Sequence, residues 1–304
     1  MENLLGAGYA LRAATRWSGE RVAHFHGVWA SAPGMAGLVL SELCDTPFSL
    51  SGHAYDLFER GGDGWLREKA RSAQWVRTST EVGRKRLLEI GVDEAKVLLV
   101  RRGLPERPPF DPEKAIGSPC RIVSVGRMVT KMGFDRQIPL YTALKQAGFL
   151  FRVDWIGDGP ERSRLEQEVD RAGLSDLIRF RGRLPYEEVE TFYQRGDIFV
   201  FTGRIDCNGD RAGLPNAIAE AMAWGLPVFA TDVGAVGEAV RHAQTGFLWP
   251  GNPAAEDILD ALANPANLST CRQQAYQWVE NMFDSRTNLA PLLRRFSGVT
   301  FCRP

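Results

Sequence analysis

Short runs of β-branched and aromatic residues alternate along this chain with longer segments of helical periodicity. This alternation is typical of βα units, in which each helix carries the chain back so that consecutive strands run parallel. The expected strands are residues 21–26, 48–53, 75–79, 97–101, 121–125, 152–156, 178–181, 198–201, 227–231 and 246–249. The pattern therefore predicts an α/β protein built on parallel sheets.

A proline-rich segment separates four of these strands from the other six. Residues 103–112, GLPERPPFDP, hold four of the 17 prolines, and proline at this density ends regular structure. Beyond it, apolar residues recur at three- and four-residue steps in residues 135–147, 161–172, 186–194 and 216–224. We therefore predict two Rossmann-like, doubly wound domains, residues 1–108 and 109–284, and a last helix and tail, residues 285–304, that can return to the first domain.

The first half has fewer elements than a complete doubly wound domain. Its opening segment, residues 1–19, has the pattern of a helix rather than of a first strand. Gly6-Ala7-Gly8 within it is a poor match to a dinucleotide-binding loop, because no strand precedes it and Leu11 stands where the third glycine belongs. We expect an N-terminal domain that lacks part of the usual fold.

Composition narrows the classes of function. The 37 basic and 37 acidic side chains give a net charge of zero, so no long-range field favours nucleic acid. The five cysteines form no CxxC pair, and no apolar run is long enough to span a membrane. These features predict a cytoplasmic protein, with peripheral membrane contact left open.

The segment that carries most chemistry is residues 213–225, GLPNAIAEAMAWG, which is followed by a buried strand. Pro215 near the first turn predicts a helix whose N-terminal amides face the edge of the sheet, where the amides and the helix dipole favour a phosphate. Glu220 lies near the middle of this helix and can accept hydrogen bonds from a ribose diol. The alternative is an ordinary solvated glutamate.

This segment resembles the donor-site signature of family 4 retaining glycosyltransferases, which have the GT-B fold of two domains facing a cleft. The resemblance implies that Glu220 binds the ribose of a nucleotide sugar. The family's other glutamate, which faces the donor sugar, falls on Ala212, and Asp210 is the nearest carboxylate. The resemblance also implies phosphate contacts for the helix start, which comprises Gly213, Leu214, Pro215 and Asn216.

A second resemblance lies in residues 124–134, SVGRMVTKMGF. It implies that Gly126 and Arg127 meet the donor diphosphate, where a fixed cation stabilises the negative charge that the leaving group gains. The family's lysine position falls on Met132, and Lys131 precedes it by one residue. Lys131 is either a second diphosphate ligand that reaches in through its flexible side chain or a solvated lysine.

Further matches concern the base and the sugar. Residues 155–165, WIGDGPERSRL, place Gly157 beside the donor crevice, and FRGRL places the backbone of Arg183 and Leu184 against the nucleobase. In the first half, PFSLSGHAYDLF resembles the segment with the family's N-domain histidine, which implies that His53 approaches the donor sugar. The alternative is a structural histidine that caps the turn before Asp56.

The sequence gives no support for a metal or an additional cofactor. His24 and His26 share one face of a strand, but no third ligand stands at metal-binding spacing. The chain contains no Asp-x-Asp pair, which disfavours the metal-dependent glycosyltransferase architecture, and no GxSxG or phosphate-binding loop. The expected ligand is a nucleotide sugar alone.

The resemblance as a whole implies a retaining transfer of a hexose from a UDP- or GDP-sugar to a hydroxyl acceptor. The acceptor would be a glycan, a lipid-linked sugar or a small molecule, in the synthesis of envelope or exopolysaccharide glycans. His53, Arg127 and Lys131 are the expected catalytic residues. The changes at Ala212 and Met132 also fit a second hypothesis, a catalytically impaired or truncated relative that binds a nucleotide sugar, a glycan or a protein.

Overall fold

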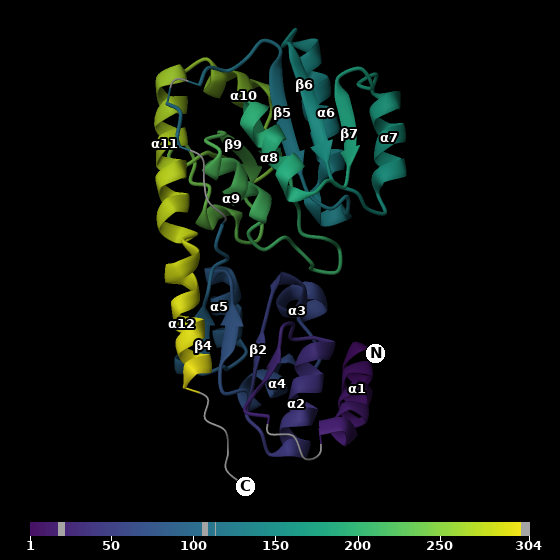
Figure 1. Cartoon of the computed structure of the whole chain (residues 1–304). Coiled ribbons are helices and arrows are strands. Elements are labelled where there is room, and N and C mark those ends of the chain that lie inside the picture. Colours follow the sequence, from purple (N-terminus) through teal and green to yellow (C-terminus); the bar gives the residue numbers. More distant parts are fainter. Residues whose placement is uncertain (18–21, 105–108, 113, 299–304) are drawn as a thin grey trace. The chain divides into compact units, whose positions relative to one another are not determined.

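The computed structural model describes residues 1–17, 22–104, 109–112 and 114–298 (Figure 1). By their contacts the residues divide into two compact units. The N-terminal unit comprises Met1–Gly103, Cys207–Gly213 and Asp284–Pro304, and the C-terminal unit comprises Leu104–Asp206 and Leu214–Phe283. The predicted domain boundary after residue 108 falls at residues 105–108, outside the described residues. No helix in the described part of the chain has the length and apolarity needed to cross a membrane.

The N-terminal unit is built on a parallel sheet of four strands in the order β1-β2-β3-β4. The strands are β1 (Phe25–Gly27), β2 (Phe48–Ser51), β3 (Val76–Thr78) and β4 (Val97–Leu99). The helices are α1 (Glu2–Trp17), α2 (Ala32–Cys44), α3 (Ala54–Phe58), α4 (Leu66–Ser72), α5 (Glu81–Glu89) and α12 (Ser285–Ser297). The four predicted strands and the opening helix are therefore confirmed. The first strand begins at Phe25 and not near residue 21, so His24 lies before it; residue 21 itself is outside the described residues.

Small residues let the first two helices pack closely (Figure 1). Gly6 of α1 lies against the backbone of α2, where a Cβ atom on it would come within 2.2 Å of the carbonyl oxygen of Ala32. This glycine therefore allows close helix packing and is not part of a dinucleotide-binding loop.

Thr80 caps α5 by accepting a hydrogen bond from the amide of Gly83 at 3.0 Å, which satisfies one of the free amides of the first turn.

The C-terminal unit is built on a six-stranded parallel sheet in the order β10-β9-β8-β5-β6-β7. The strands are β5 (Cys120–Val125), β6 (Phe151–Ile156), β7 (Ile178–Gly182), β8 (Ile198–Phe201), β9 (Val228–Thr231) and β10 (Phe247–Trp249). The helices are α6 (Phe134–Gln146), α7 (Arg162–Arg171), α8 (Tyr186–Arg195), α9 (Asn216–Ala223), α10 (Ala255–Leu262) and α11 (Pro265–Met282). All six strands predicted for this half are confirmed. The central strands β8 and β9 are buried at every position, as expected of a sheet with helices on both faces.

The strand order creates one crevice in this sheet. From β5 the chain continues to β6 and β7 on one side and then crosses to β8, β9 and β10 on the other. The connections that follow β5 and β8 therefore leave in opposite directions, and the carboxyl ends of these two strands border a gap. Open α/β sheets bind their ligands at such a switch point.

Candidate donor site at the switch point

Loops from three neighbouring strands cross one another at the carboxyl edge of the C-terminal sheet. The amide of Gly126, after β5, donates to the carbonyl of Ile156 at 2.9 Å, and the amide of Gly157 donates to the carbonyl of Gly182 at 2.8 Å. Gly157 has φ +130°, and a Cβ atom on it would lie 1.9 Å from the carbonyl oxygen of Gly126. Only glycine fits here, so Gly157 allows the backbones of these loops to meet.

Arg127 lies in the loop that follows β5 at this edge. Its side chain is exposed, and within the described residues its guanidinium group has no hydrogen-bond or ion-pair partner. The next residue, Met128, is fully buried and its amide donates to the carbonyl of Asp158 at 2.9 Å. A fixed backbone thus presents an unneutralised cation at the switch point.

The turn after Arg127 is tied to the end of β8. The hydroxyl of Thr202 donates to the carbonyl of Gly133 at 2.6 Å, and the amide of Arg204 donates to the carbonyl of Lys131 at 3.0 Å. Gly133 has φ +69°, and a Cβ atom on it would clash with the carbonyl of Thr202. These bonds hold the turn that carries Lys131, the 3₁₀ turn Thr130–Met132, beside the end of β8.

Met132, which the resemblance aligns with the expected lysine, packs inward. Its terminal methyl group lies where a Cβ atom of Gly126 would be 2.5 Å away, and it contacts the core of the unit. Lys131, its neighbour, is half-buried. Met132 and Lys131 therefore have different surroundings, and the side chain of Met132 packs against the core.

The helix that carries Glu220 begins beside the same edge. Pro215 precedes α9, and no side chain caps the first turn within the described residues. Leu214 and Asn216 flank this proline, so backbone amides at the helix start remain to bind an anion. Because α9 follows β8, its N-terminus and Arg127 lie at the carboxyl ends of adjacent strands.

Glu220 itself is not a solvated helix glutamate. Only 8% of it is exposed, and its Oε2 atom accepts a hydrogen bond from the hydroxyl of Tyr193 at 3.0 Å. Tyr193 is fully buried in α8, and burial together with the neighbouring carboxylate raises its pKa well above the ordinary value. The carboxylate is thereby held in one orientation by a donor that stays protonated.

The loop after β7 completes this edge of the sheet. Gly182 has φ +71° and is followed by Arg183 and Leu184, which lead into α8. Arg183 is exposed and Leu184 is half-buried. The C-terminal unit thus gathers most of the predicted site residues at one edge, namely Gly126, Arg127, Lys131, Gly157, Arg183, Leu184, Leu214, Pro215 and Asn216. Glu220 lies further along α9, where it meets Tyr193 of α8.

Three predicted site residues belong to the N-terminal unit: His53, Asp210 and Gly213. The carboxylate of Asp210 accepts a hydrogen bond from the amide of Arg211 at 2.8 Å. A Cβ atom on Gly213 would lie 3.7 Å from that of Ala54, the residue after His53. Ala212, at the family's first glutamate position, is 7% exposed and offers no carboxylate.

His53 lies immediately before α3, two residues after the end of β2. Its amide donates to Oδ2 of Asp56 at 3.2 Å, and its ring packs edge-on against Trp29 with ring centres 4.7 Å apart. Burial, and secondarily the positive charge of Arg77, lowers the pKa of the ring. His53 is therefore a neutral imidazole at the carboxyl end of a strand.

His24, just before β1, and His26, within it, are bound by other groups of the N-terminal unit. His24 and His26 both hydrogen-bond the hydroxyl of Ser49, at 2.7 and 2.8 Å, and both rings stack on Trp75. Within residues 1–17, 22–104, 109–112 and 114–298, no three histidine, cysteine, aspartate or glutamate side chains are grouped as metal ligands. The histidines instead form part of the packing of the N-terminal unit.

Two residues of this candidate site are not predicted from the sequence. The sequence predicts Tyr193 only as part of the apolar face of residues 186–194, although a buried tyrosine hydroxyl requires a polar partner. Arg204 follows β8, its amide binds the Lys131 carbonyl, and its guanidinium pairs with Asp135 at 2.9 Å. The sequence signal for Arg204 is its position three residues after the predicted strand 198–201, at the edge where ligands bind.

Known proteins resemble this chain in sequence and in fold. The sequence model of the glycosyl transferases group 1 family matches residues 108–278. The amylovoran biosynthesis glycosyltransferase of Erwinia amylovora is 32% identical over 170 residues, which are 56% of this chain and 42% of the relative. The chain thus aligns with less than half the length of this relative.

Two solved structures show the same fold at low sequence identity. Sucrose-phosphate synthase from Thermosynechococcus elongatus is 18% identical, with a TM-score of 0.77 over 96% of this chain and 78% of that one. HepE from Anabaena, solved in complex with UDP, is 18% identical, with a TM-score of 0.67 over 87% of this chain and 76% of that one. These likenesses confirm the predicted GT-B fold class. Because the family model matches more than half of the residues of this chain, the chain belongs to the glycosyl transferases group 1 family.

Proposed function

We propose that this chain binds a UDP- or GDP-sugar at the switch point of its C-terminal unit and transfers the hexose, with retention, to a hydroxyl acceptor. The observation that carries the proposal lies at the carboxyl ends of adjacent strands, where Arg127 is exposed and the N-terminus of α9 begins. Among the described residues, no side chain pairs with the Arg127 guanidinium or caps that N-terminus. Both features attract an anion, and a diphosphate can bridge them. Family membership and the UDP complex of HepE support a nucleotide diphosphate as that anion.

In this proposal each group has a separate role. Arg127 and Lys131 bind the diphosphate, whose negative charge grows as the bond to the sugar breaks. The backbone amides of Leu214 and Asn216, on either side of Pro215, bind the same group at the start of α9. Fixed positive groups stabilise that charge without reorganising in the transition state. Glu220, oriented by Tyr193, accepts hydrogen bonds from the ribose hydroxyls.

The remaining contacts concern the base and the sugar. The backbone of Arg183 and Leu184 lies against the nucleobase, Gly126 and Gly157 leave room for the donor, and His53 approaches the transferred sugar as a neutral hydrogen-bonding group. The proposal includes no metal or further cofactor, so transfer should persist in EDTA. The biosynthetic name of the Erwinia relative supports a role in exopolysaccharide assembly, which we place in the cytoplasm.

The test is release of UDP or GDP from a panel of common nucleotide sugars, with and without glycan acceptors. Arg127→Ala should abolish release and weaken nucleotide binding, because it removes the unpaired cation. Arg152→Ala is the matched control: it is an exposed arginine of the same unit near the amino end of β6, at the opposite edge of the sheet. Equal loss in both variants, or full activity in Arg127→Ala, would refute the diphosphate assignment.

A second function is favoured by the changed positions Ala212 and Met132. Neither side chain can bind a sugar or a phosphate through charge, and Met132 packs against the core. A protein that retains Arg127 and Glu220 without these groups can bind a nucleotide sugar without transferring the sugar. Thermal stabilisation by UDP or GDP without any donor turnover would favour this binding function over the transferase.

A further inference from the structure

The N-terminal unit contains a pocket whose lining differs from that of the donor site. It has a volume of 900 Å³ and lies between α1, α3 and the loop that leads into α4. Its polar lining includes Glu2, Asn3, Glu59 and Asp63, and two aromatic side chains, Tyr55 and Trp65, also line it. A volume of several hundred Å³ suits a ligand of two or three ring units.

The two aromatic side chains of this acidic pocket remain exposed. Tyr55 is 39% exposed and Trp65 is 54% exposed, so both side chains have surface left to contact a ligand. The hydroxyl of Tyr55 donates to Glu2 at 3.0 Å, and this bond raises the pKa of Tyr55 to about 12, which keeps the group protonated. Open aromatic faces bind flat, weakly polar C–H surfaces.

A buried network fixes the floor of the pocket. Lys69 is fully buried, and its ammonium group donates to Asp63 at 2.5 Å and to Asn3 at 2.8 Å. The amide of Asn3 in turn donates to both carboxylate oxygens of Asp63, at 3.1 and 3.0 Å. The polar groups of the floor are therefore held in place before any ligand arrives.

The rim of the pocket is held in an unusual backbone conformation. Arg60 has φ +52°, and the two glycines that follow, Gly61 and Gly62, have φ +86° and +102°. A non-glycine residue in this region is costly, and such residues concentrate where a loop must hold a ligand. The guanidinium of Arg86 donates to the carbonyl of Gly61 at 2.5 Å and steadies the turn.

The lining excludes several kinds of ligand. Four carboxylates of the lining, Glu2, Asp56, Glu59 and Asp63, outnumber its cations, which are Arg60 and the amino group of Met1. Lys69 lies behind the lining and is paired with Asp63, so a phosphate is repelled. No group of three metal-binding side chains occurs in the described ranges, which include the whole lining. The polar floor disfavours a lipid chain. A neutral ring that carries both hydroxyl groups and C–H faces fits what remains.

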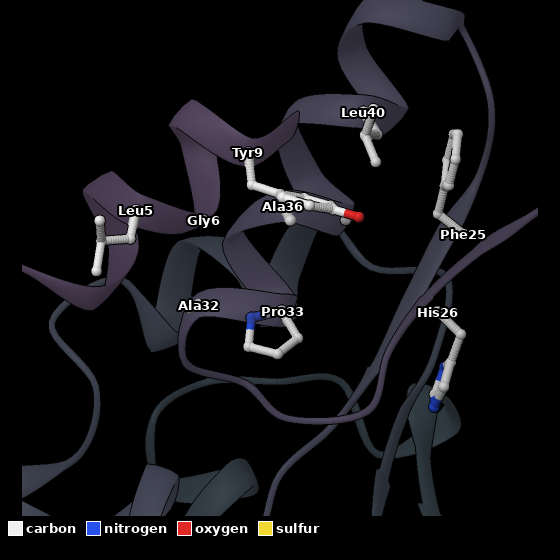
Figure 2. A pocket seen from close by; sticks show the side chains of 10 residues that line it. Leu5, Gly6, Tyr9, Phe25, His26, Ala32, Pro33, Ala36 and Leu40 are labelled. Atoms are coloured by element: carbon white, nitrogen blue, oxygen red, sulfur yellow. The ribbon is translucent and has the colours of Figure 1, made fainter. Parts of the chain in front are cut away.

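The adjacent pocket of the same unit provides a contrast (Figure 2). It has a volume of 540 Å³ and is lined by apolar side chains and by Tyr9 and His26. Figure 2 shows Tyr9 reaching from α1 across α2, over Ala36. Both ring nitrogens of His26 already bond to serine hydroxyls, at 2.8 and 3.2 Å. This apolar pocket lacks the carboxylates needed to bind hydroxyl groups.

We propose that the acidic pocket between α1 and α3 binds a neutral sugar unit, which stacks on Trp65 or Tyr55 and donates hydroxyl hydrogen bonds to Glu2 and Glu59. Its role as the glycan acceptor site rests on the proposed transferase function. The binding itself does not, because all of its residues belong to the N-terminal unit.

The test is electrophoresis of the full chain in native gels that contain dextran, yeast mannan, galactomannan or hydroxyethyl cellulose, without nucleotide. At least one neutral polysaccharide should slow the wild type, and Trp65→Ala should weaken that interaction about tenfold, as the loss of one stacking ring does. Trp65→Phe keeps a ring and should retain most of the binding. Tyr9→Ala, an exposed aromatic of the apolar pocket, should bind as the wild type does.

Three results would overturn the proposal: no retardation of the wild type in any gel, retardation that Trp65→Ala leaves unchanged, or an equal loss in Tyr9→Ala. An additional gel with cationic chitosan provides a fourth such result: retardation in that gel alone, lost at high salt, would show that the pocket binds cations instead. Circular dichroism of each variant checks that it is folded. Loss of nucleotide binding by the Arg127→Ala variant leaves these gels unaffected, so failure of the transferase proposal and failure of the sugar site are separable.

Discussion

Replacing Tyr193 by phenylalanine removes one hydroxyl group from the interior of the C-terminal unit and leaves the ring in place. The fully buried ring keeps its packing, so no cavity forms. What is lost is the 3.0 Å hydrogen bond to Oε2 of Glu220. A hydrogen bond to a charged group contributes about 1.5–3 kcal/mol. Because Glu220 is 8% exposed and water can reach it in part, we expect a loss near the lower end, about 1.5–2 kcal/mol.

The matched control is Tyr141→Phe. Tyr141 is equally buried in the same unit, but its hydroxyl donates at 2.8 Å to the neutral side chain of Gln137, which also accepts from Trp155. This variant should lose only about 0.5–1.5 kcal/mol, as for a bond between neutral groups. Urea unfolding of each variant measures the change in the free energy of unfolding.

The two variants should also differ in nucleotide binding. If Tyr193 orients Glu220 toward the ribose, Tyr193→Phe weakens UDP binding by about tenfold, equivalent to one hydrogen bond. Binding of 2′,3′-dideoxy-UDP, which lacks the diol, should change little, and Tyr141→Phe should affect neither ligand. Equal losses for UDP and the dideoxy analogue, measured by calorimetry, would refute the orienting role. An unchanged unfolding free energy would refute the estimate for the hydrogen bond.

Two further predictions concern backbone geometry and pH. Gly157→Ala should destabilise the C-terminal unit by at least about 3 kcal/mol, since φ +130° strains the backbone and the new Cβ atom would sit 1.9 Å from the Gly126 carbonyl; a thermal midpoint unchanged in scanning calorimetry would contradict this. Burial, followed by the charges of His24 and Arg77, lowers the pKa of His26 from 6.5 to about 4, so the unfolded chain binds this proton first as the pH falls. The stability that neutral His26 contributes is complete above about pH 6.5 and is lost by about pH 4, a loss of about 3 kcal/mol that solvent screening reduces to about 1.5 kcal/mol. Urea midpoints of wild type and His26→Gln across this range should converge at low pH, and parallel curves would contradict the assignment.

The sequence by itself determined the elements of both sheets. Residues 198–201, IFVF, form a short apolar run with helical patterns on either side, and they are β8, buried throughout. Similarly, Pro215 before an amphipathic segment marks the start of α9 at Asn216. Such signals are local: strand and helix periodicity, and the missing amide of proline, act within a few residues of chain. The parallel order then follows from βα alternation, which brings Arg127 and α9 to the same edge.

The tertiary structure alone decided which side chains meet. Tyr193 and Glu220 lie 27 residues apart, and Lys69 and Asn3 lie 66 apart, so no periodicity relates the members of either pair. Met132 and Lys131 are neighbours in sequence, yet only the packing against Gly126 directs the methionine toward the core. Long-range partners depend on how the elements stack, because burial makes each polar group find a donor or acceptor wherever the fold supplies one.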